Sequence, residues 1–148
     1  FFESGRGVYL WGDNEPYFAD ANYVSNAILG ARLQGNLRGS QVVGRKTAGS
    51  ISGVVEDHLI STGIETIYEG ITISTVVGGR DLQPLVYGSA GQVVVSTYDR
   101  DKKRLILDGG FTRLYTKWDT AGTGRYVQNA AAWLVNYERF GDDLFKDK

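Results

Sequence analysis

One stretch limits the possible folds of this chain more than any other: the apolar run from Arg104 to Leu107 and the glycines after it. A short run with almost no polar break is typical of a strand that is covered on both faces, as in a parallel or mixed sheet flanked by helices. Asp108, Gly109 and Gly110 end the run abruptly, because glycine adopts backbone angles that other residues resist. The sequence therefore predicts an α/β fold whose buried strand leaves through a glycine-rich loop.

A helix is expected soon after this loop, between Gly124 and Tyr137. Apolar residues recur there at helical spacing and form one broad stripe, namely Tyr126, Val127, Ala130, Ala131, Trp133, Leu134 and Tyr137. In open α/β sheets, ligands usually bind where strands give way to loops. The loop between this strand and this helix is therefore the first place to look for a site.

The first third of the chain reads as a strand, a helix and a second, short strand. Residues 7–12 are apolar and bounded by glycines, which predicts a strand. Pro16 suits a first helical position, and Asp20 is a candidate N-cap. The helical face that follows consists of Ala21, Val24, Ala27, Ile28 and Ala31. Three glycines within residues 30–39 predict irregular structure after this helix. Residues 41–44 predict a short strand.

The middle of the chain predicts further strands. Residues 66–74 alternate apolar and polar side chains, and Gly70 interrupts them, which indicates a bulge or a bend. Residues 82–87 and 92–98 are two more apolar runs, so close to the strand at 103–107 that antiparallel hairpins are favoured. The sheet should therefore be mixed. We expect one α/β domain over residues 1–140 and a polar tail over residues 141–148.

Composition excludes several classes of function. Hydrophobic residues make up 42% of the chain and charged residues 22%, which are ordinary globular values. The formal net charge of −1 and the lack of a basic block argue against nucleic-acid binding. No run approaches the roughly 18 apolar residues of a membrane span. Cysteine is absent, which removes disulfides, thiolate catalysis and cysteine-based metal sites, and no cofactor motif is strong enough to predict a cofactor.

The first residues predict that a segment precedes Phe1. The chain contains no methionine, even at position 1. Residues 1–5 read as the last turn of a helix that closes on a glycine C-cap. The cellular compartment stays open, because no targeting signal is present to be read.

Three segments resemble the class I glutamine amidotransferase-like domains, especially their non-catalytic and trehalose-utilisation-like relatives. The first is Phe2 to Gly12, with Gly5, Gly7 and the run Val-Tyr-Leu-Trp-Gly, followed by a helix that carries Ala21 and Asn22. The second is His58 to Ile64, which is similar to a His-Pro-Ile-Thr-x-Gly-Leu segment with Leu59 in place of the proline. The third is Arg104 to Thr112, leading to Asn129–Leu134. Together they span most of residues 1–137.

The resemblance implies a three-layer, flavodoxin-like sandwich in which one or two strands and helices precede the equivalent of Phe1. Either a preceding segment or another polypeptide would then complete the sheet. Catalytic members of this family place a cysteine nucleophile at the position of residues 11–13 and a histidine near Gly110 and Phe111. Neither residue type is present there, so the resemblance implies a non-catalytic relative, because amide hydrolysis needs the nucleophile and its base.

Several carboxylates follow predicted strands or precede helices: Asp13, Glu15, Asp20, Asp108 and Asp119. If the fold is right, Asp13, Glu15 and Asp108 approach each other at one edge of the sheet. Such oxygen ligands suit Ca²⁺ or Mg²⁺, and a carboxylate pair suits acid–base work. The alternative is helix capping and turn formation, which favour the same residues and which we consider the better explanation.

Two further motifs carry weaker signals. Asp119 to Gly122 matches the switch segment of small GTPases, but the chain has no phosphate-binding loop, so a loop that caps the last helix explains it better. His58, the single histidine, lacks a Ser–His–Asp arrangement around it. We interpret it as a loop residue that is hydrogen-bonded to its neighbours rather than as a base.

The three tryptophans divide into two groups. Trp133 lies on the predicted helix stripe and should belong to the core. Trp11 and Trp118 each lie near a polar turn, where they could line a crevice or anchor an interface. Aromatic rings beside carboxylates also suit sugar binding, although ordinary cores contain the same mixture.

Two hypotheses follow. The first is a non-catalytic module that acts as a structural or protein-interaction domain of a larger assembly, bound to another polypeptide or to copies of itself, because an unfinished sheet leaves an edge that must be covered. The second is a carbohydrate- or divalent-metal-dependent binding protein or hydrolase that uses Asp13, Glu15 and Asp108 near Trp11 and Trp118. Nucleotide binding through Asp119 ranks lowest.

Overall fold

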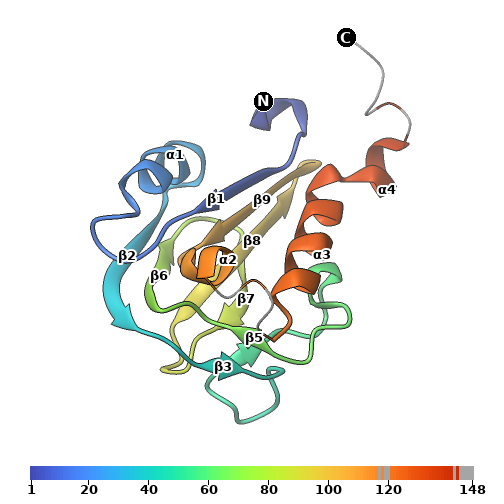
Figure 1. Cartoon of the computed structure of the whole chain (residues 1–148). Coiled ribbons are helices and arrows are strands. Elements are labelled where there is room, and N and C mark those ends of the chain that lie inside the picture. Colours follow the sequence, from blue (N-terminus) through green and yellow to red (C-terminus); the bar gives the residue numbers. More distant parts are fainter. Residues whose placement is uncertain (117, 119–120, 142, 144–148) are drawn as a thin grey trace.

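A five-stranded sheet forms the centre of the molecule in the computed structural model, which describes residues 1–116, 118, 121–141 and 143 (Figure 1). From one edge to the other, its strands are β1 (Val8–Trp11), β9 (Lys103–Asp108), β8 (Val93–Arg100), β7 (Leu82–Tyr87) and β4 (Gly53–Val54). The strand that the apolar run predicts is β9, which lies between two neighbours and is buried from Arg104 to Asp108.

The sheet is mixed, as the sequence predicts. β1 runs parallel to β9, with Trp11 aligned with Asp108. The pairs β9–β8, β8–β7 and β7–β4 are all antiparallel. The predicted hairpins are confirmed, and β1 stands at the outer edge of the sheet.

The described residues also form two smaller antiparallel pairs: β2 (Ala31–Arg38) with β6 (Thr72–Gly78), and β3 (Val42–Val43) with β5 (Ile67–Tyr68). β2 corrects the expectation of irregular structure at residues 30–39. Gly35 has a φ of 95° and lies where the register shifts between Gln34 and Leu37, so the glycine serves a bulge inside a strand. The single strand with a bulge or a bend that residues 66–74 predict is instead two strands, β5 and β6, which separate at Gly70 and pair with different partners.

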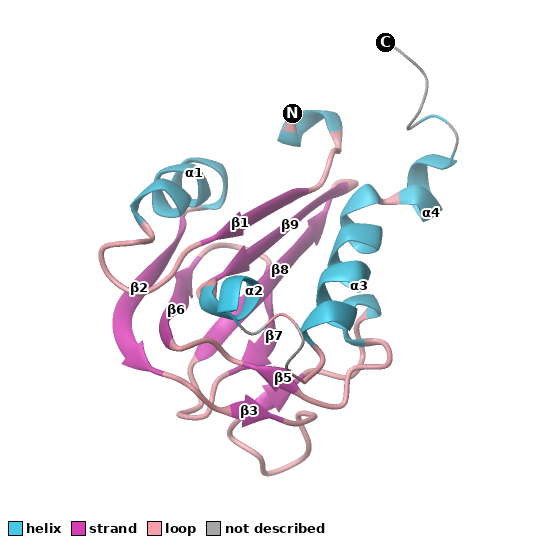
Figure 2. Cartoon of the chain, viewed as in Figure 1, coloured by secondary structure: helices cyan, strands magenta, loops and turns pink. Residues whose placement is uncertain are grey.

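In the described part of the chain, short helices connect or flank the strands (Figure 2): the 3₁₀ turns η1 (Phe2–Ser4) and η2 (Leu59–Ser61), and the helices α1 (Ala19–Leu29), α2 (Thr112–Thr116), α3 (Thr123–Val135) and α4 (Tyr137–Phe140). η1 closes on Gly5 in the left-handed conformation, as residues 1–5 predict. α3 is the predicted amphipathic helix. It ends where Asn136 adopts a left-handed conformation. α2 was not expected.

The start of α1 differs from the prediction. Its N-cap is Phe18, so Asp20 lies in the first turn and Pro16 belongs to the turn before the helix. Both expectations were wrong, because a local capping pattern does not fix where the chain leaves the preceding turn. In its observed position the Asp20 carboxylate still suits the positive end of the helix dipole.

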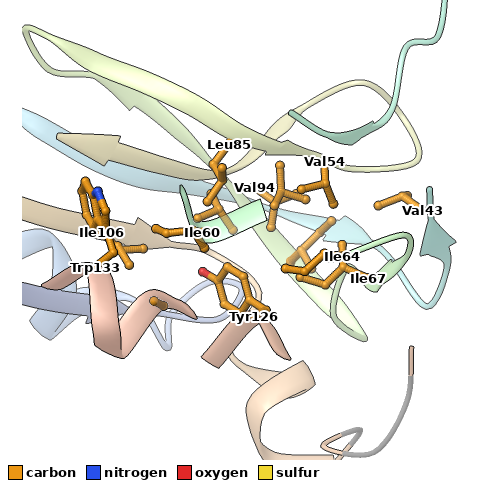
Figure 3. Close-up of a cluster of buried hydrophobic side chains, with 14 residues drawn as sticks. Val43, Val54, Ile60, Ile64, Ile67, Leu85, Val94, Ile106, Tyr126 and Trp133 are labelled. Carbon is orange, nitrogen blue, oxygen red and sulfur yellow. The ribbon is translucent and has the colours of Figure 1, made fainter. Parts of the chain in front are cut away.

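The core occupies both faces of the central sheet. On one face α3 packs against side chains that include Ile106, Val94 and Ile60, through its buried Tyr126 and Trp133 (Figure 3). On the other face, Leu105 and Leu107 of β9 pack with residues of α1 and of the β2–β6 pair. Trp133 is therefore a core residue, as predicted.

These observations establish an α/β fold built on a mixed sheet, with a modest helix content. None of the helices in the described part of the chain is long and apolar enough to cross a membrane. Of the predicted polar tail, only residues 141 and 143 are described.

Candidate functional site

The loops that follow β1 and β9 meet at one end of the sheet, where these two parallel strands finish side by side (Figure 1). The backbone nitrogen of Gly12 donates to the carbonyl oxygen of Asp108 at 2.8 Å. The backbone nitrogen of Phe111 donates back to the carbonyl oxygen of Gly12 at 3.1 Å. Because ligands of α/β proteins favour the carboxyl ends of strands, this junction is the candidate site.

Asp108 ends β9 with a carboxylate that is fully buried. Arg113 in α2 donates with Nη2 to Asp108 Oδ1 at 2.8 Å, and with Nη1 to Oδ1 and Oδ2 at 2.9 and 3.1 Å. The backbone nitrogen of Gly110 also donates to Oδ1, at 2.8 Å, and the Tyr9 hydroxyl donates to Oδ2 at 2.5 Å. A buried carboxylate needs such hydrogen bonding beside its cation, because moving both charges out of water is costly.

Two tyrosine hydroxyls meet beside this ion pair. The Tyr126 hydroxyl of α3 lies 2.8 Å from the Tyr9 hydroxyl and 3.3 Å from Asp108 Oδ2. Burial, and next the negative charge of Asp108, raise the pKa of both phenols well above the ordinary value, so both keep their protons. Burial, the largest single effect, would lower the pKa of Arg113, but the negative groups around it, with Asp108 first among them, together raise the pKa. We name Tyr9, Asp108, Arg113 and Tyr126 the closed cluster, since it fastens β1, β9, α2 and α3 together.

Glycines let the loop after β9 approach its neighbours closely. A Cβ atom on Gly110 would lie 2.3 Å from the carbonyl oxygen of Glu69, and one on Gly109 would lie 2.4 Å from that of Ser74. Glu69 is a second fully buried carboxylate. It accepts hydrogen bonds from the backbone nitrogen and the hydroxyl of Ser89 at 2.6 and 2.9 Å. The loop is thus fixed by backbone contact, which explains why glycine follows Asp108 twice.

Sequence patterns did not single out Glu69 as a site residue. They also did not single out Tyr9, Arg113 and Tyr126, whose side chains donate to Asp108. A carboxylate at the end of an otherwise apolar strand does signal a buried cation, so Arg113, five residues later, could have been found. No local signal marks Glu69, whose hydrogen-bond donors Gln41 and Ser89 lie 28 and 20 residues away.

An exposed row of stacked rings borders the junction on its outer side. The ring centroids of Trp11 and Phe111 are 6.1 Å apart, and those of Phe111 and Tyr115 are 6.2 Å apart, with interplanar angles of 21° and 14°. Trp11 is 53% exposed and Tyr115 is 76% exposed. We name these three residues the aromatic ridge. Large aromatic side chains that stay exposed together are typical of interaction surfaces.

A hollow of about 720 Å³ lies on the α1 side of the aromatic ridge. Besides the ridge, its wall includes Asp13, Tyr17, Asp20 and Thr112. Asp13 Oδ1 is buried and lacks a hydrogen-bond partner, and burial raises the pKa of this carboxyl. We name this space the acidic hollow.

A second depression of about 470 Å³ lies on the α3 side of the aromatic ridge. Its wall is almost wholly apolar and consists of Tyr9, Trp11, Phe111, Leu114, Tyr115, Trp118, Val127, Ala130, Ala131 and Leu134. Trp118 is 50% exposed and Ala131 is exposed. We name this space the apolar groove. Trp11 and Trp118, whose roles the sequence left open, both line it.

The carboxylates singled out in the sequence do not share one environment. Asp108 points into the closed cluster, Asp13 lines the acidic hollow, and Glu15 is exposed, with its backbone nitrogen donating to the carbonyl oxygen of Gly35 at 3.2 Å. Asp119 and Thr120 of the switch-like motif lie outside the described residues, whereas Ala121 and Gly122 lie inside them. Among the residues that are described, no group of three or more His, Cys, Asp or Glu side chains could hold a metal ion.

His58 is the N-cap of η2, where its Nδ1 accepts a hydrogen bond from the backbone nitrogen of Ile60 at 3.0 Å. Its ring also packs against Trp133, with 5.1 Å between the ring centroids. Burial, and next the charge of Arg104, lower the pKa of His58. The expected loop residue that is hydrogen-bonded to its neighbours is confirmed.

Comparisons with known proteins give similarity of structure only. No protein family matches the sequence, and no curated protein does. Among solved structures, the mmIFT52 N-terminal domain superposes with a TM-score of 0.64 at 12% identity, over 90% of this chain and 66% of that one. The cytoplasmic protein STM1381 from Salmonella typhimurium LT2 superposes with a TM-score of 0.57 at 14% identity, over 93% of this chain and 56% of that one. This chain therefore spans about two thirds or less of each neighbour, and it shares their fold.

Proposed function

We propose that this chain is a non-catalytic, amidotransferase-like module that binds another polypeptide. In this proposal the fold is a flavodoxin-like sandwich in which the partner extends the sheet at β1. The order of elements supports it: β1 leads into α1, and β9, parallel to β1, leads through the glycine loop towards α3. The complete absence of cysteine supports a role in binding rather than in amide hydrolysis.

The open edge of β1 carries this proposal. β1 is the outermost strand of the sheet, and within the described residues β9 is the strand that pairs with it. An unpaired edge presents backbone N–H and C=O groups that readily accept another strand. The edge adjoins the apolar groove, because Tyr9 and Trp11 of β1 form part of its wall.

The shape of the apolar groove indicates what else the partner brings. Along α3, the lining residues Val127, Ala130, Ala131 and Leu134 follow helical spacing and form one stripe. A stripe with small alanines in the middle allows a second helix to approach closely. We therefore propose that the occupant is a strand–helix segment of another polypeptide, with its strand beside β1 and an apolar helix face in the groove.

Two neighbouring alanines of α3 provide a matched test. Ala131 and Ala132 are both exposed, but Ala131 alone of the two lines the apolar groove. Displayed strand–helix polypeptides would be selected for binding to the chain, and the bound site would be mapped by amide hydrogen exchange. We expect protection of β1 and of residues 127–134, loss of binding in Ala131→Arg, and normal binding in Ala132→Arg. Both variants should keep their free energy of unfolding within about 0.5 kcal/mol.

The proposal fails if the selected polypeptides protect other surfaces, or if Ala131→Arg binds them as the unchanged chain does. Light scattering over a concentration series decides whether the partner is a second copy of the chain. A dimer that Ala131→Arg dissociates and Ala132→Arg does not would assign the same surface to self-association.

A further inference from the structure

The acidic hollow is a second potential binding site, which shares the aromatic ridge with the apolar groove but lies on the other side of it. Its volume of about 720 Å³ falls within the range of roughly 300–1,000 Å³ that is usual for small-molecule sites. It lies at the carboxyl end of β1, where ligands of α/β proteins tend to bind.

The charges in this hollow have one sign. Asp13 and Asp20 line it, and no lysine or arginine is found among its described lining residues. Asp20 occupies the first turn of α1, where the helix dipole offsets its charge. Asp13 has no such position, and its Oδ1 atom is buried without a donor. The backbone of Asn14 donates to the Asp13 carboxylate, but this leaves Oδ1 without a partner, so the fold does not fully satisfy its charge.

Aromatic rings form much of the remaining wall. Tyr17 and Tyr115 are 74% and 76% exposed, and Trp11, the last residue of β1, also lines the hollow. The faces of aromatic rings attract organic cations, particularly where a carboxylate is close by. A bare metal ion fits less well, because Ca²⁺ and Mg²⁺ need about six oxygen ligands, and the described residues offer no cluster of three acidic or histidine side chains.

We propose that the acidic hollow binds an organic cation, an alkylammonium or guanidinium group, with Asp13 as its counter-ion and the rings of Tyr17, Tyr115 and Trp11 as its walls. The Asp13 carboxylate, which lines the hollow, accepts the N–H group of a primary ammonium or a guanidinium, and it attracts a quaternary ammonium by charge alone. The source of the cation is either a free small molecule or a lysine or arginine side chain.

A pair of probes of equal shape tests the need for positive charge. Choline and 3,3-dimethylbutan-1-ol differ in replacing the quaternary nitrogen by carbon. N-acetyl-lysine amide and N-acetyl-arginine amide represent side chains of a polypeptide. Each would be titrated into the isolated chain while amide chemical shifts are followed by NMR. We expect at least one cation to shift the amides of Gly12, Asp13 and Tyr17, and the neutral alcohol to bind about tenfold more weakly than choline if choline is that cation.

The tightest-binding probe then identifies the source of the cation. If choline binds most tightly, the source is a free small molecule, and if an amino-acid amide does, the source is a side chain of a polypeptide. If an amide binds best, its charge is tested against N-acetyl-norleucine amide, which has the same backbone and an uncharged side chain. The titration contains no polypeptide partner, so its result is independent of the binding proposed at β1.

Asp13 and Glu15 supply the matched variants. Asp13→Asn should weaken binding of the preferred cation about tenfold, whereas Glu15→Gln removes the same charge two residues away, outside the hollow, and should leave it unchanged. Spectra that match the unchanged chain confirm that both variants fold. The proposal is overturned if no cation shifts these amides, if the uncharged analogue binds equally well, if Asp13→Asn binds as before, or if methyl glucoside occupies the hollow more tightly than every cation.

Discussion

Asp108 and Asp13 stand close to the junction of β1 and β9, yet their carboxylates have opposite surroundings. Asp108 is fully buried, and five donor groups from four residues satisfy it. Asp13 lines an open hollow, and one of its oxygen atoms has no donor at all. The comparison separates a carboxylate whose hydrogen-bond needs the fold meets from one for which we propose a ligand.

This difference shows that a buried carboxylate whose hydrogen bonds are all made within the fold is poor evidence for a ligand-binding or catalytic site. In the closed cluster the donors of four residues occupy the Asp108 carboxylate, and Arg113 Nε alone of the guanidinium nitrogens has no partner, so little acceptor capacity remains for a substrate. The acidic hollow keeps an unmet charge beside exposed rings, which is the usual condition of a site that awaits a ligand. Three substitutions test this division, from the largest expected effect to the smallest.

Arg113→Met should cause the largest loss. It leaves the Asp108 carboxylate buried without its cation, so we expect the free energy of unfolding to fall by about 3–5 kcal/mol. Urea denaturation measures this change. The double variant Arg113→Met with Asp108→Asn removes the unpaired charge and should recover part of the loss. If the double variant is no more stable than Arg113→Met, the closed cluster is not held by its ion pair.

Tyr9→Phe should have an intermediate effect. It deletes the hydroxyl that donates to Asp108 at 2.5 Å and leaves the ring in place. Because the acceptor is charged, we expect a loss of about 2 kcal/mol in the free energy of unfolding. Tyr23→Phe, at a side chain that is 82% exposed, is the matched control and should stay within about 0.5 kcal/mol. Equal effects of the two substitutions would contradict the role given to the Tyr9 hydroxyl.

Asp13→Asn should have the smallest effect, with the opposite sign. Burial raises the pKa of Asp13 above its unfolded value, so the folded chain binds that proton more tightly. The resulting stability is fully present below the unfolded pKa and is lost as pH rises through the folded pKa. Asparagine does not ionise, so Asp13→Asn does not lose stability as the pH rises. At pH 7 the free energy of unfolding of this variant should be at least as large as that of the unchanged chain.

Unfolding free energies of both proteins between pH 3 and pH 7 give the comparison, with Glu15→Gln as the control for a lost surface charge. Two results would contradict this prediction. In one, Asp13→Asn is clearly less stable than the unchanged chain at pH 7. In the other, its free energy of unfolding falls between acid and neutral pH as much as that of the unchanged chain, and either result would mean that the fold already satisfies the Asp13 carboxylate.

The sequence by itself determined the features that depend on local patterns. The apolar run of β9 and the stripe of α3 follow from side-chain periodicity, and both are found in the structure. The same patterns predicted a mixed sheet, because the spacing of the last strands favours hairpins. Resemblance to the amidotransferase-like domains stays a hypothesis, since the structural neighbours share the fold at 12% and 14% identity.

Only the tertiary structure decided what the carboxylates do. Tyr9 and Tyr126 reach Asp108 from 99 and 18 residues away, and Ser89 and Gln41 reach Glu69 from 20 and 28 residues away. Spacing along the chain carries no record of such contacts, because they form when separate elements pack against each other. Asp13 and Asp108 therefore look alike in the sequence, and the donors that folding brings to each of them make one structural and leave the other open.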